Sequence, residues 1–268
     1  MSDMKFYINS GFETTHYSIK SKKIRRDIRL AVLADLHNCM LEDMGRRLFH
    51  EVDKEAPDLV IKAGDMVDSI KGSDPTRVMK VVGMIHEHYP VIYGMGNHEK
   101  KILQGGFLHR ERAQLIRGLN DARLKILSDS YKYIEDTGIK VSCLDLDLSY
   151  FCRGLFKPLS VRQIEEKIGE LERDKFNILI AHDPQYFVPY SDYGSDLVLS
   201  GHMHGGIVRL PYLGGVVSPK LRLFPEYDAG SFERKASRML VTKGLGCHTI
   251  QLRINDPTEL MIVDLKKE

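Results

Sequence analysis

The sequence predicts an α/β fold, and three observations support that prediction. Short apolar runs alternate with segments of helical periodicity along most of the chain, which is the pattern of βαβ units. The chain has 268 residues, enough to bury a sizeable core without disulfides. The sequence contains no internal repeat, low-complexity tract or Pro/Ser-rich linker. We therefore expect a single domain that spans residues 1–268.

The first part of the chain supplies three predicted strands separated by two helices. Residues 28–34 (IRLAVLA) form an apolar run typical of a buried strand. Apolar residues at helical spacing follow it: Leu41, Met44, Leu48 and Val52. Pro57 ends this helix, and residues 59–63 (LVIKA) are the next predicted strand. Pro75 then opens a second helix, before a third strand at residues 91–93.

The second part of the chain continues the alternation. A helix is predicted over residues 115–122, with strands near residues 132–135 and 139–144. Ser160 and Gln163 have the spacing of a capping box, which predicts a helix start. The apolar residues of that helix are Ile164, Ile168 and Leu171. The remaining predicted strands are residues 176–181, 196–200, 239–242 and 260–265.

Charge and composition exclude several classes of protein. The formal net charge is +2, which argues against a strongly basic nucleic-acid binder. The longest stretch without a charged residue is residues 197–208, too short and too polar to cross a bilayer. The first twelve residues lack the order of a secretory signal, and the four cysteines include no CxxC pair. We expect reduced thiols and a cytoplasmic protein, while the oligomeric state is not indicated.

Metal-binding residue types directly follow five of the apolar strands. In chain order they are Asp35 with His37, Asp65, Asn97 with His98, His182, and His202 with His204. In open α/β sheets, ligand sites lie beyond the carboxyl ends of the strands. We therefore expect these side chains to meet at one edge of the fold, although they span some 170 positions of sequence.

The types of these residues indicate the kind of metal. Carboxylates, an amide and imidazoles without a thiolate suit Mn²⁺, Fe or Zn²⁺ better than Mg²⁺ or Ca²⁺. The set is larger than one tetrahedral ion can use, which implies two ions. An isolated Asp-X-His, or His182 alone, usually has a structural role. Five such groups in order after apolar strands favour a metal site.

These motifs together resemble the calcineurin-like metallophosphoesterase family. The matching elements lie within residues 28–206: Asp-X-His, Gly-Asp-X-X-Asp, Gly-Asn-His-Glu, a single His and Gly-His-X-His. The resemblance implies a four-layer α/β sandwich with two central mixed β-sheets flanked by helices. The tail is similar to the small bacterial phosphodiesterase branch of the family, chiefly in residues 201–210, the Pro/Gly-rich stretch to residue 230, and residues 241–246 (VTKGLG).

The resemblance also implies roles for individual residues. The first of two divalent ions, with Mn²⁺ preferred and Fe or Zn²⁺ as alternatives, would be held by Asp35, His37, Asp65 and His204. The second would be held by Asp65 as the bridging ligand, Asn97, His182 and His202. His98 would be the catalytic acid or transition-state stabiliser, with Asp68 as its partner.

We expect a metal-dependent phosphoesterase that hydrolyses phosphodiester or pyrophosphate bonds of a small phosphate ester. Attack by a metal-bridging hydroxide would follow from two adjacent cations. A catalytically silent scaffold with the same fold is one alternative, less favoured because every ligand position and His98 are present. A metal-dependent nuclease is the other, and the lack of a strongly basic face counts against it.

Three segments remain open to two interpretations. The basic residues within 20–29 could touch an anionic membrane surface or nucleic acid, although a solvated strand pair is the simpler interpretation. Residues 150–159 and 221–227 mix aromatic with basic residues. They could line an apolar and basic groove for an amphiphilic phosphate ester, or they could be ordinary covering loops.

Overall fold

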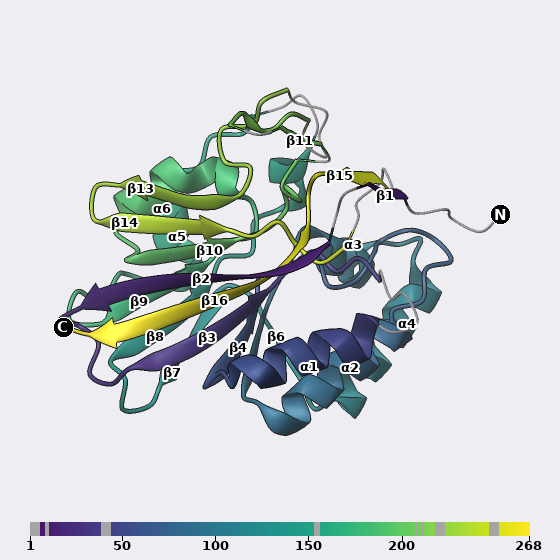
Figure 1. Cartoon of the computed structure of the whole chain (residues 1–268), viewed down its shortest axis with the longest axis horizontal. Helices are drawn as coiled ribbons and strands as arrows, with labels where there is room; N and C mark the ends of the chain where they lie inside the picture. Colours follow the sequence, from purple (N-terminus) through teal and green to yellow (C-terminus); the bar gives the residue numbers. More distant parts are fainter. Residues whose placement is uncertain are drawn as a thin grey trace.

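Two six-stranded mixed β-sheets lie face to face in the computed structural model, with helices over their outer surfaces (Figure 1). The structure describes residues 6–8, 11–38, 44–152, 156–206, 208–210, 212–217, 223–246 and 252–268. The arrangement is the four-layer α/β sandwich that the family resemblance implies.

The first sheet joins the two ends of the chain. Its strand order is β2 (Phe12–Ser21), β16 (Thr258–Lys267), β3 (Ile28–Leu33), β4 (Leu59–Lys62), β5 (Val91–Gly94) and β6 (Ile126–Leu127). Strands β3 to β6 are parallel to one another. Strand β16 runs antiparallel to β3 and parallel to β2, so β2 and β16 both run opposite to the other four strands.

The second sheet is built around four parallel strands. Its order is β13 (Gly230–Arg234), β14 (Ser237–Val241), β10 (Leu197–Ser200), β9 (Phe176–Ile180), β8 (Ile139–Cys143) and β7 (Ser130–Ile134). Strands β8, β9, β10 and β14 are parallel, and the two outer strands are antiparallel to their neighbours. Two small two-stranded sheets complete the β-structure described: β1 (Phe6–Ile8) with β15 (Leu252–Ile254), and β11 (Arg209–Leu210) with β12 (Gly214–Gly215).

The helices cover the outer face of each sheet. They are α1 (Met44–Glu55), α2 (Thr76–His88), α3 (Asn97–Gln104), α4 (His109–Asp121), α5 (Val161–Ile168) and α6 (Phe187–Tyr193), with short 3₁₀ helices η1 (Leu148–Phe151) and η2 (Pro184–Tyr186). One apolar cluster fills the space between α1, α2, α4 and the first sheet. A second lies between α5, α6 and the second sheet. A third joins the facing sheets, with Leu30 and Ile61 packed in one core with Ile178 and Leu199.

Most predicted elements are present, with small differences at their ends. The capping box of Ser160 and Gln163 starts α5 as expected. This helix ends at Ile168 rather than including Leu171, because Gly169 takes a left-handed φ of 81° there. Leu41 of the first predicted helix lies outside the described residues. Cys143 is buried and Cys152 exposed, both as free thiols, and Cys39 and Cys247 also lie outside the described residues.

The basic segment of residues 20–29 connects strands β2 and β3. Lys23 pairs with Asp196 at 2.7 Å, and Arg29 pairs with Asp264 at 2.8 Å. Both side chains therefore make local ion pairs within the sandwich. Among the helices that the structure describes, none combines the length and apolarity needed to span a bilayer.

Candidate metal centre

The candidate ligands lie in turns that directly follow the buried strands. Five of them have a left-handed backbone with φ between 48° and 70°: Asp35, His37, Asp65, His202 and His204. This conformation is uncommon for residues other than glycine and is costly unless the surroundings enforce it. All five residues with this conformation lie in the turns after β3, β4 and β10. The backbone of these turns therefore directs their side chains toward one point.

In each of the two aspartates, one carboxylate oxygen accepts a backbone hydrogen bond and the other does not. Asp35 Oδ2 accepts a hydrogen bond from His202 N at 2.8 Å, and Asp65 Oδ1 accepts one from His98 N at 2.8 Å. The other oxygens, Asp35 Oδ1 and Asp65 Oδ2, are buried and accept no hydrogen bond from any residue that the structure describes. A buried carboxylate oxygen needs a positive or hydrogen-bonding group beside it, and only imidazole nitrogens surround these two atoms, so they are suited to binding a cation.

Three imidazoles surround the free oxygen of Asp35. The Nε2 atoms of His37, His182 and His204 lie 3.8, 3.6 and 3.6 Å from Asp35 Oδ1. His182 Nε2 also lies 2.9 Å from Asp65 Oδ2. Its Nδ1 donates to the Ala63 carbonyl oxygen at 2.7 Å, which fixes the ring with Nε2 directed at the carboxylates.

The charges at this site favour a cation. Burial alone would lower the pKa of His182, but the carboxylates of Asp65 and Asp35 raise it to about 10. Burial likewise opposes the charged form of Asp65, and the imidazoles of His182 and His98 nevertheless hold its pKa well below the usual range. A divalent ion would satisfy the same carboxylates, and the oxygen and nitrogen donors fit the transition metals expected from the sequence.

Three overlapping groups of side chains have ligand atoms within 4.8 Å of one another. They are Asp35 with His37 and His204, Asp65 with His182 and His202, and His37 with Asp65 and His98. The first two groups fall within the two ligand sets that the family resemblance implies. Asn97, the first residue of α3, is buried, and its Oδ1 has no hydrogen-bond partner among the described residues. The assignment of each residue to an ion stays a prediction.

His98 stands at the edge of this cluster and contacts the expected partner. Its Nδ1 lies 3.1 Å from Asp68 Oδ1 and 3.0 Å from Ser69 N, while its Nε2 lies 3.9 Å from Asp65 Oδ2. Burial lowers the pKa of His98, but the negative charges of Asp65 and Asp68 outweigh it and raise the pKa. The Ser69 N–H donates to Nδ1, the Asp68 carboxylate beside Nδ1 stabilises the positive charge of a protonated ring, and Nε2 faces the metal cluster.

Glu99 is a site residue that the sequence did not single out. It is fully buried, and its two oxygens accept hydrogen bonds from Asp65 N at 2.9 Å, Met66 N at 2.7 Å and the Tyr93 hydroxyl at 2.8 Å. These bonds fix the turn that carries Asp65. The only signal was its place beside His98 in the Gly-Asn-His-Glu motif, which gives no hint of the turn it contacts.

A glycine-rich segment near the end of the chain supports the turn that carries Asp35. Gly244 has a φ of 71°, and a Cβ placed there would lie 2.6 Å from Asp35 Cβ. Gly246 N donates to Asp35 O at 2.7 Å, and the Gly246 carbonyl lies 3.3 Å from His204 Nδ1. This segment therefore braces two candidate ligands that are far from it in sequence. His248, which follows it, lies outside the described residues.

Fold and site together have the features of a metal-dependent phosphoesterase. Residues 28–206 match the family model described as calcineurin-like phosphoesterase, which covers more than half of the chain. The chain therefore belongs to this family, and the resemblance drawn from the motifs is confirmed.

Three bacterial relatives align with nearly the whole chain. An uncharacterized metallophosphoesterase of Campylobacter jejuni is 26% identical over 97% of this chain, which spans 65% of that relative. The uncharacterized metallophosphoesterase YkuE of Bacillus subtilis is 24% identical over 95% of this chain and 85% of its own length. The UDP-2,3-diacylglucosamine pyrophosphatase LpxG of Chlamydia trachomatis is 22% identical, with 88% of this chain and 83% of the relative aligned.

We predict that Gly244→Ala weakens metal binding about 10- to 100-fold, the range typical for loss of a group that supports a ligand. The added methyl group would displace Asp35, since its position is 2.6 Å from Asp35 Cβ. Gly169→Ala is the matched control, because Gly169 also has a positive φ of 81° but no atom within 4 Å of the added Cβ. Calorimetric titration with Mn²⁺ measures the affinity, and equal affinity in the two variants would contradict the prediction.

Proposed function

We propose that the protein is a binuclear metal-dependent phosphoric ester hydrolase acting on phosphodiester or pyrophosphate bonds. The observation that carries this proposal is the pair of buried oxygens, Asp35 Oδ1 and Asp65 Oδ2, that accept no backbone hydrogen bond and lie among imidazole nitrogens. Membership of the phosphoesterase family supports the same reaction class.

The ligands divide naturally between two ions, of which Mn²⁺ is our first candidate. Asp35, His37 and His204 would hold one ion, and His182, His202 and Asn97 the other, with Asp65 shared. When bound, the two cations would supply hydroxide at neutral pH and neutralise charge on the phosphoryl oxygens.

His98 would protonate the leaving group, and Asp68 would position His98. The charges of Asp65 and Asp68 raise the pKa of His98 and so favour its protonated form, from which Nε2 would donate a proton to the departing oxygen. Asp68, 3.1 Å from Nδ1, would hold the ring in place and stabilise its charge. Support for a diester or pyrophosphate substrate comes from the Chlamydia trachomatis relative, which is named a pyrophosphatase.

The Mn²⁺-loaded protein should hydrolyse bis(p-nitrophenyl) phosphate, with p-nitrophenolate release as the measurement. Asp65→Ala should lose bound metal and activity together, because Asp65 contributes to two of the three ligand groups. Asp121→Ala, an exposed residue at the end of α4, is the control and should keep both. A wild-type protein with neither bound metal nor turnover would instead support the silent scaffold. Turnover unchanged in Asp65→Ala would refute the metal mechanism.

Replacing His98 by alanine should separate metal binding from catalysis. Loss of general acid catalysis should lower kcat about 10²- to 10⁴-fold, while the variant still binds its metal ions. The loss should be larger for a diester with an alkoxide leaving group than for one with p-nitrophenolate, which leaves without a proton. Steady-state kinetics on both substrates, with metal analysis, test this. Full kcat on the alkoxide substrate would show that His98 is not the acid.

The Asp68→Asn variant should have a shifted pH profile. The Asp68 carboxylate raises the pKa of His98, so the wild-type ring stays protonated to higher pH. Removing that charge lowers the pKa, and the alkaline limb of kcat/KM should move to lower pH while the acid limb stays in place. An alkaline limb that does not move would mean that it reports another group.

A further inference from the structure

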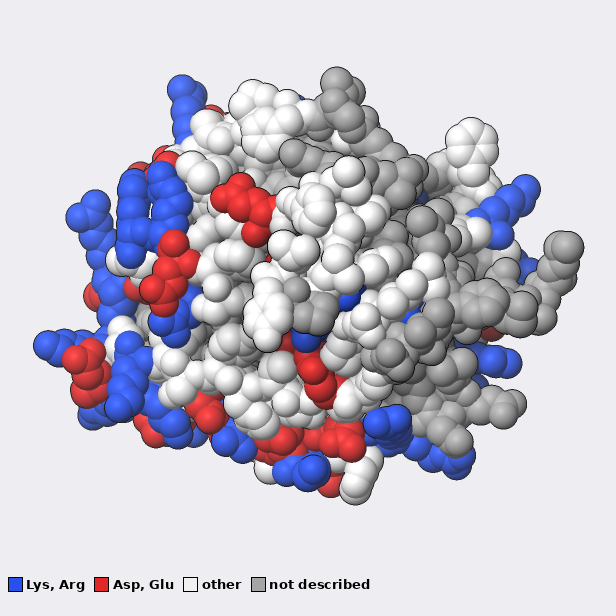
Figure 2. Space-filling model, turned by 45° about the horizontal axis from the view of Figure 1, so that its top comes forward, with Lys and Arg blue, Asp and Glu red and all other residues white. Residues whose placement is uncertain are grey.

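Arg253 is buried, which sets it apart from the other arginines that the structure describes. In Figure 2, Lys and Arg side chains gather toward the margins of the face shown. Arg253 lies on β15 and is only 1% exposed, with its Nη1 3.2 Å from Asp256 Oδ2. A buried guanidinium is costly unless its charge is paired and its donors are bonded. The ion pair with Asp256 offsets the charge, and the remaining donors are available for other groups.

All three nitrogens of the Arg253 guanidinium donate to backbone carbonyl oxygens. Nε donates to Gly246 O at 3.0 Å, and Nη2 donates to Lys243 O. Nη1 donates to Pro257 O at 3.1 Å. The acceptors belong to two separate parts of the chain, the segment of residues 243–246 after β14 and the turn before β16. The planar, rigid fork of an arginine can hold carbonyl groups of two segments at fixed positions.

The segment of residues 243–246 contacts two candidate metal ligands in turn. Gly246 N donates to Asp35 O at 2.7 Å, and His204 Nδ1 donates to Gly246 O at 3.3 Å. The Gly246 carbonyl thus accepts from Arg253 and from His204 together. An imidazole fixed through Nδ1 presents Nε2 as its metal ligand, and His204 Nε2 lies 3.6 Å from Asp35 Oδ1. Arg253 therefore acts on both candidate ligands through one residue.

The ion-pair partner of Arg253 supports the turn that carries His204. A Cβ placed on Gly205, the next residue, would lie 2.1 Å from Asp256 Oδ1. The Asp256 carboxylate therefore packs directly against the backbone of this turn. The pair of Arg253 and Asp256 thus contacts both sequence segments that determine where His204 lies.

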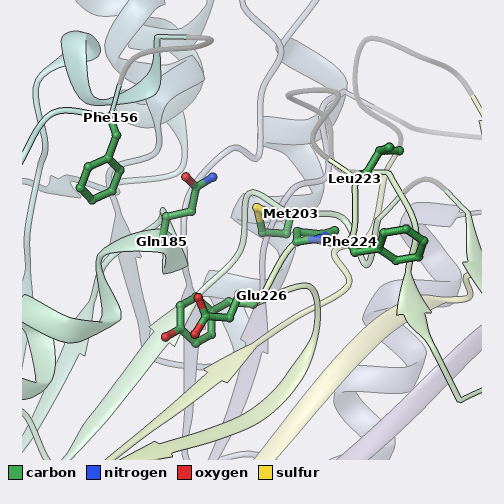
Figure 3. A pocket seen from close by; sticks show the side chains of 8 residues that line it. Phe156, Gln185, Met203, Leu223, Phe224 and Glu226 are labelled. Carbon is green, nitrogen blue, oxygen red and sulfur yellow. The ribbon is translucent and has the colours of Figure 1, made fainter.

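The same turn is less closely packed on another side. Met203 borders a hollow of about 330 Å³, with Phe156 and Leu223 among the residues around it (Figure 3). Residues of the two aromatic segments that the sequence left open to two interpretations thus surround this hollow. A turn beside a hollow has fewer packing contacts to hold it in place. The position of His204 therefore depends strongly on the contacts made from the side of Arg253.

We propose that Arg253 is a positioning residue that sets the affinity for one of the two metal ions. This ion is the one assigned to Asp35, His37 and His204. The inference rests on the two-ion site of the proposed hydrolase and adds a residue that supports it. The ion assigned to Asn97 should bind as before, because none of the contacts named above involves Asn97.

Calorimetric titration of the metal-free protein with Mn²⁺ tests the proposal. The wild type should bind two ions. Arg253→Met should keep one of them and bind the other about 10- to 100-fold more weakly. Arg29→Met is the matched control, because the Arg29 guanidinium contacts Asp264 and Glu55 instead of the 243–246 segment, and it should keep both ions. Unchanged affinity in Arg253→Met, or an equal loss in Arg29→Met, would overturn the proposal.

The Arg253→Lys variant separates geometry from charge, and it is the milder variant if Arg253→Met does not fold. Lysine keeps the charge beside Asp256, but a single ammonium group does not replace the fork that joins two segments. We expect one ion to bind at least about tenfold more weakly. Circular dichroism of the metal-free protein shows that the variant is folded. Wild-type affinity for both ions in folded Arg253→Lys would show that charge alone suffices, which would overturn the proposal.

The double variant Arg253→Met/Asn97→Ala identifies the ion that depends on Arg253. Asn97→Ala alone should weaken the ion assigned to Asn97. If the two residues support different ions, the double variant should bind neither ion tightly. One tightly bound ion in the double variant would mean that Arg253 and Asn97 support the same ion, which overturns the proposal.

Metal binding is measured without turnover, so this inference and the hydrolase function can fail separately. Two ions in the wild type and one in Arg253→Met, without hydrolysis of bis(p-nitrophenyl) phosphate, would support the role of Arg253 and refute the hydrolase function. Hydrolysis by the wild type with unchanged metal affinity in Arg253→Met would have the opposite meaning. A wild type that binds a single ion would refute the two-ion site and, with it, this role of Arg253.

Discussion

The structure depends on the burial of two carboxylates, Asp35 and Asp65, at the same edge of the sandwich. Burial raises the pKa of Asp35 to about 7, and the nearby charge of Asp65 adds to that effect. Each carboxylate is held by one backbone N–H, from His202 and His98 respectively. The neighbouring imidazoles stabilise the charge that remains. Without these contacts, two adjacent negative groups out of water would be too costly to keep.

These contacts require both sheets to be in place. Asp35 follows β3 of the first sheet, whereas His202 follows β10 of the second, so their hydrogen bond joins the two layers at the site. His182 repeats this link, because it follows β9 and donates to the carbonyl oxygen of Ala63 after β4. The site is therefore a property of the packed sandwich, and no single βαβ unit contains it.

The sequence predicted the parts of the site that follow from strand ends and residue types. The runs before Asp35, Asp65 and His182 are mostly apolar, so both the strands and the polar residues after them were recognisable. Strand β2 was missed because it is an edge strand with mixed polarity, and half-buried residues alternate with exposed ones along part of it. The roles of Glu99 and Gly244 were not predictable, since each acts on a turn that only tertiary packing brings near.

The central position of β16 has a consequence for the order in which the molecule can form. This strand is hydrogen-bonded to β3 on one side and to β2 on the other, and β2 has no other neighbour in the described sheet. During synthesis from the N-terminus, β2 must wait for residues 258–267 before it can join the sheet. Gly244 and Gly246, which brace Asp35, are also made late. The nascent chain therefore carries the ligands of β3, β4 and β5 long before it can assemble a metal centre.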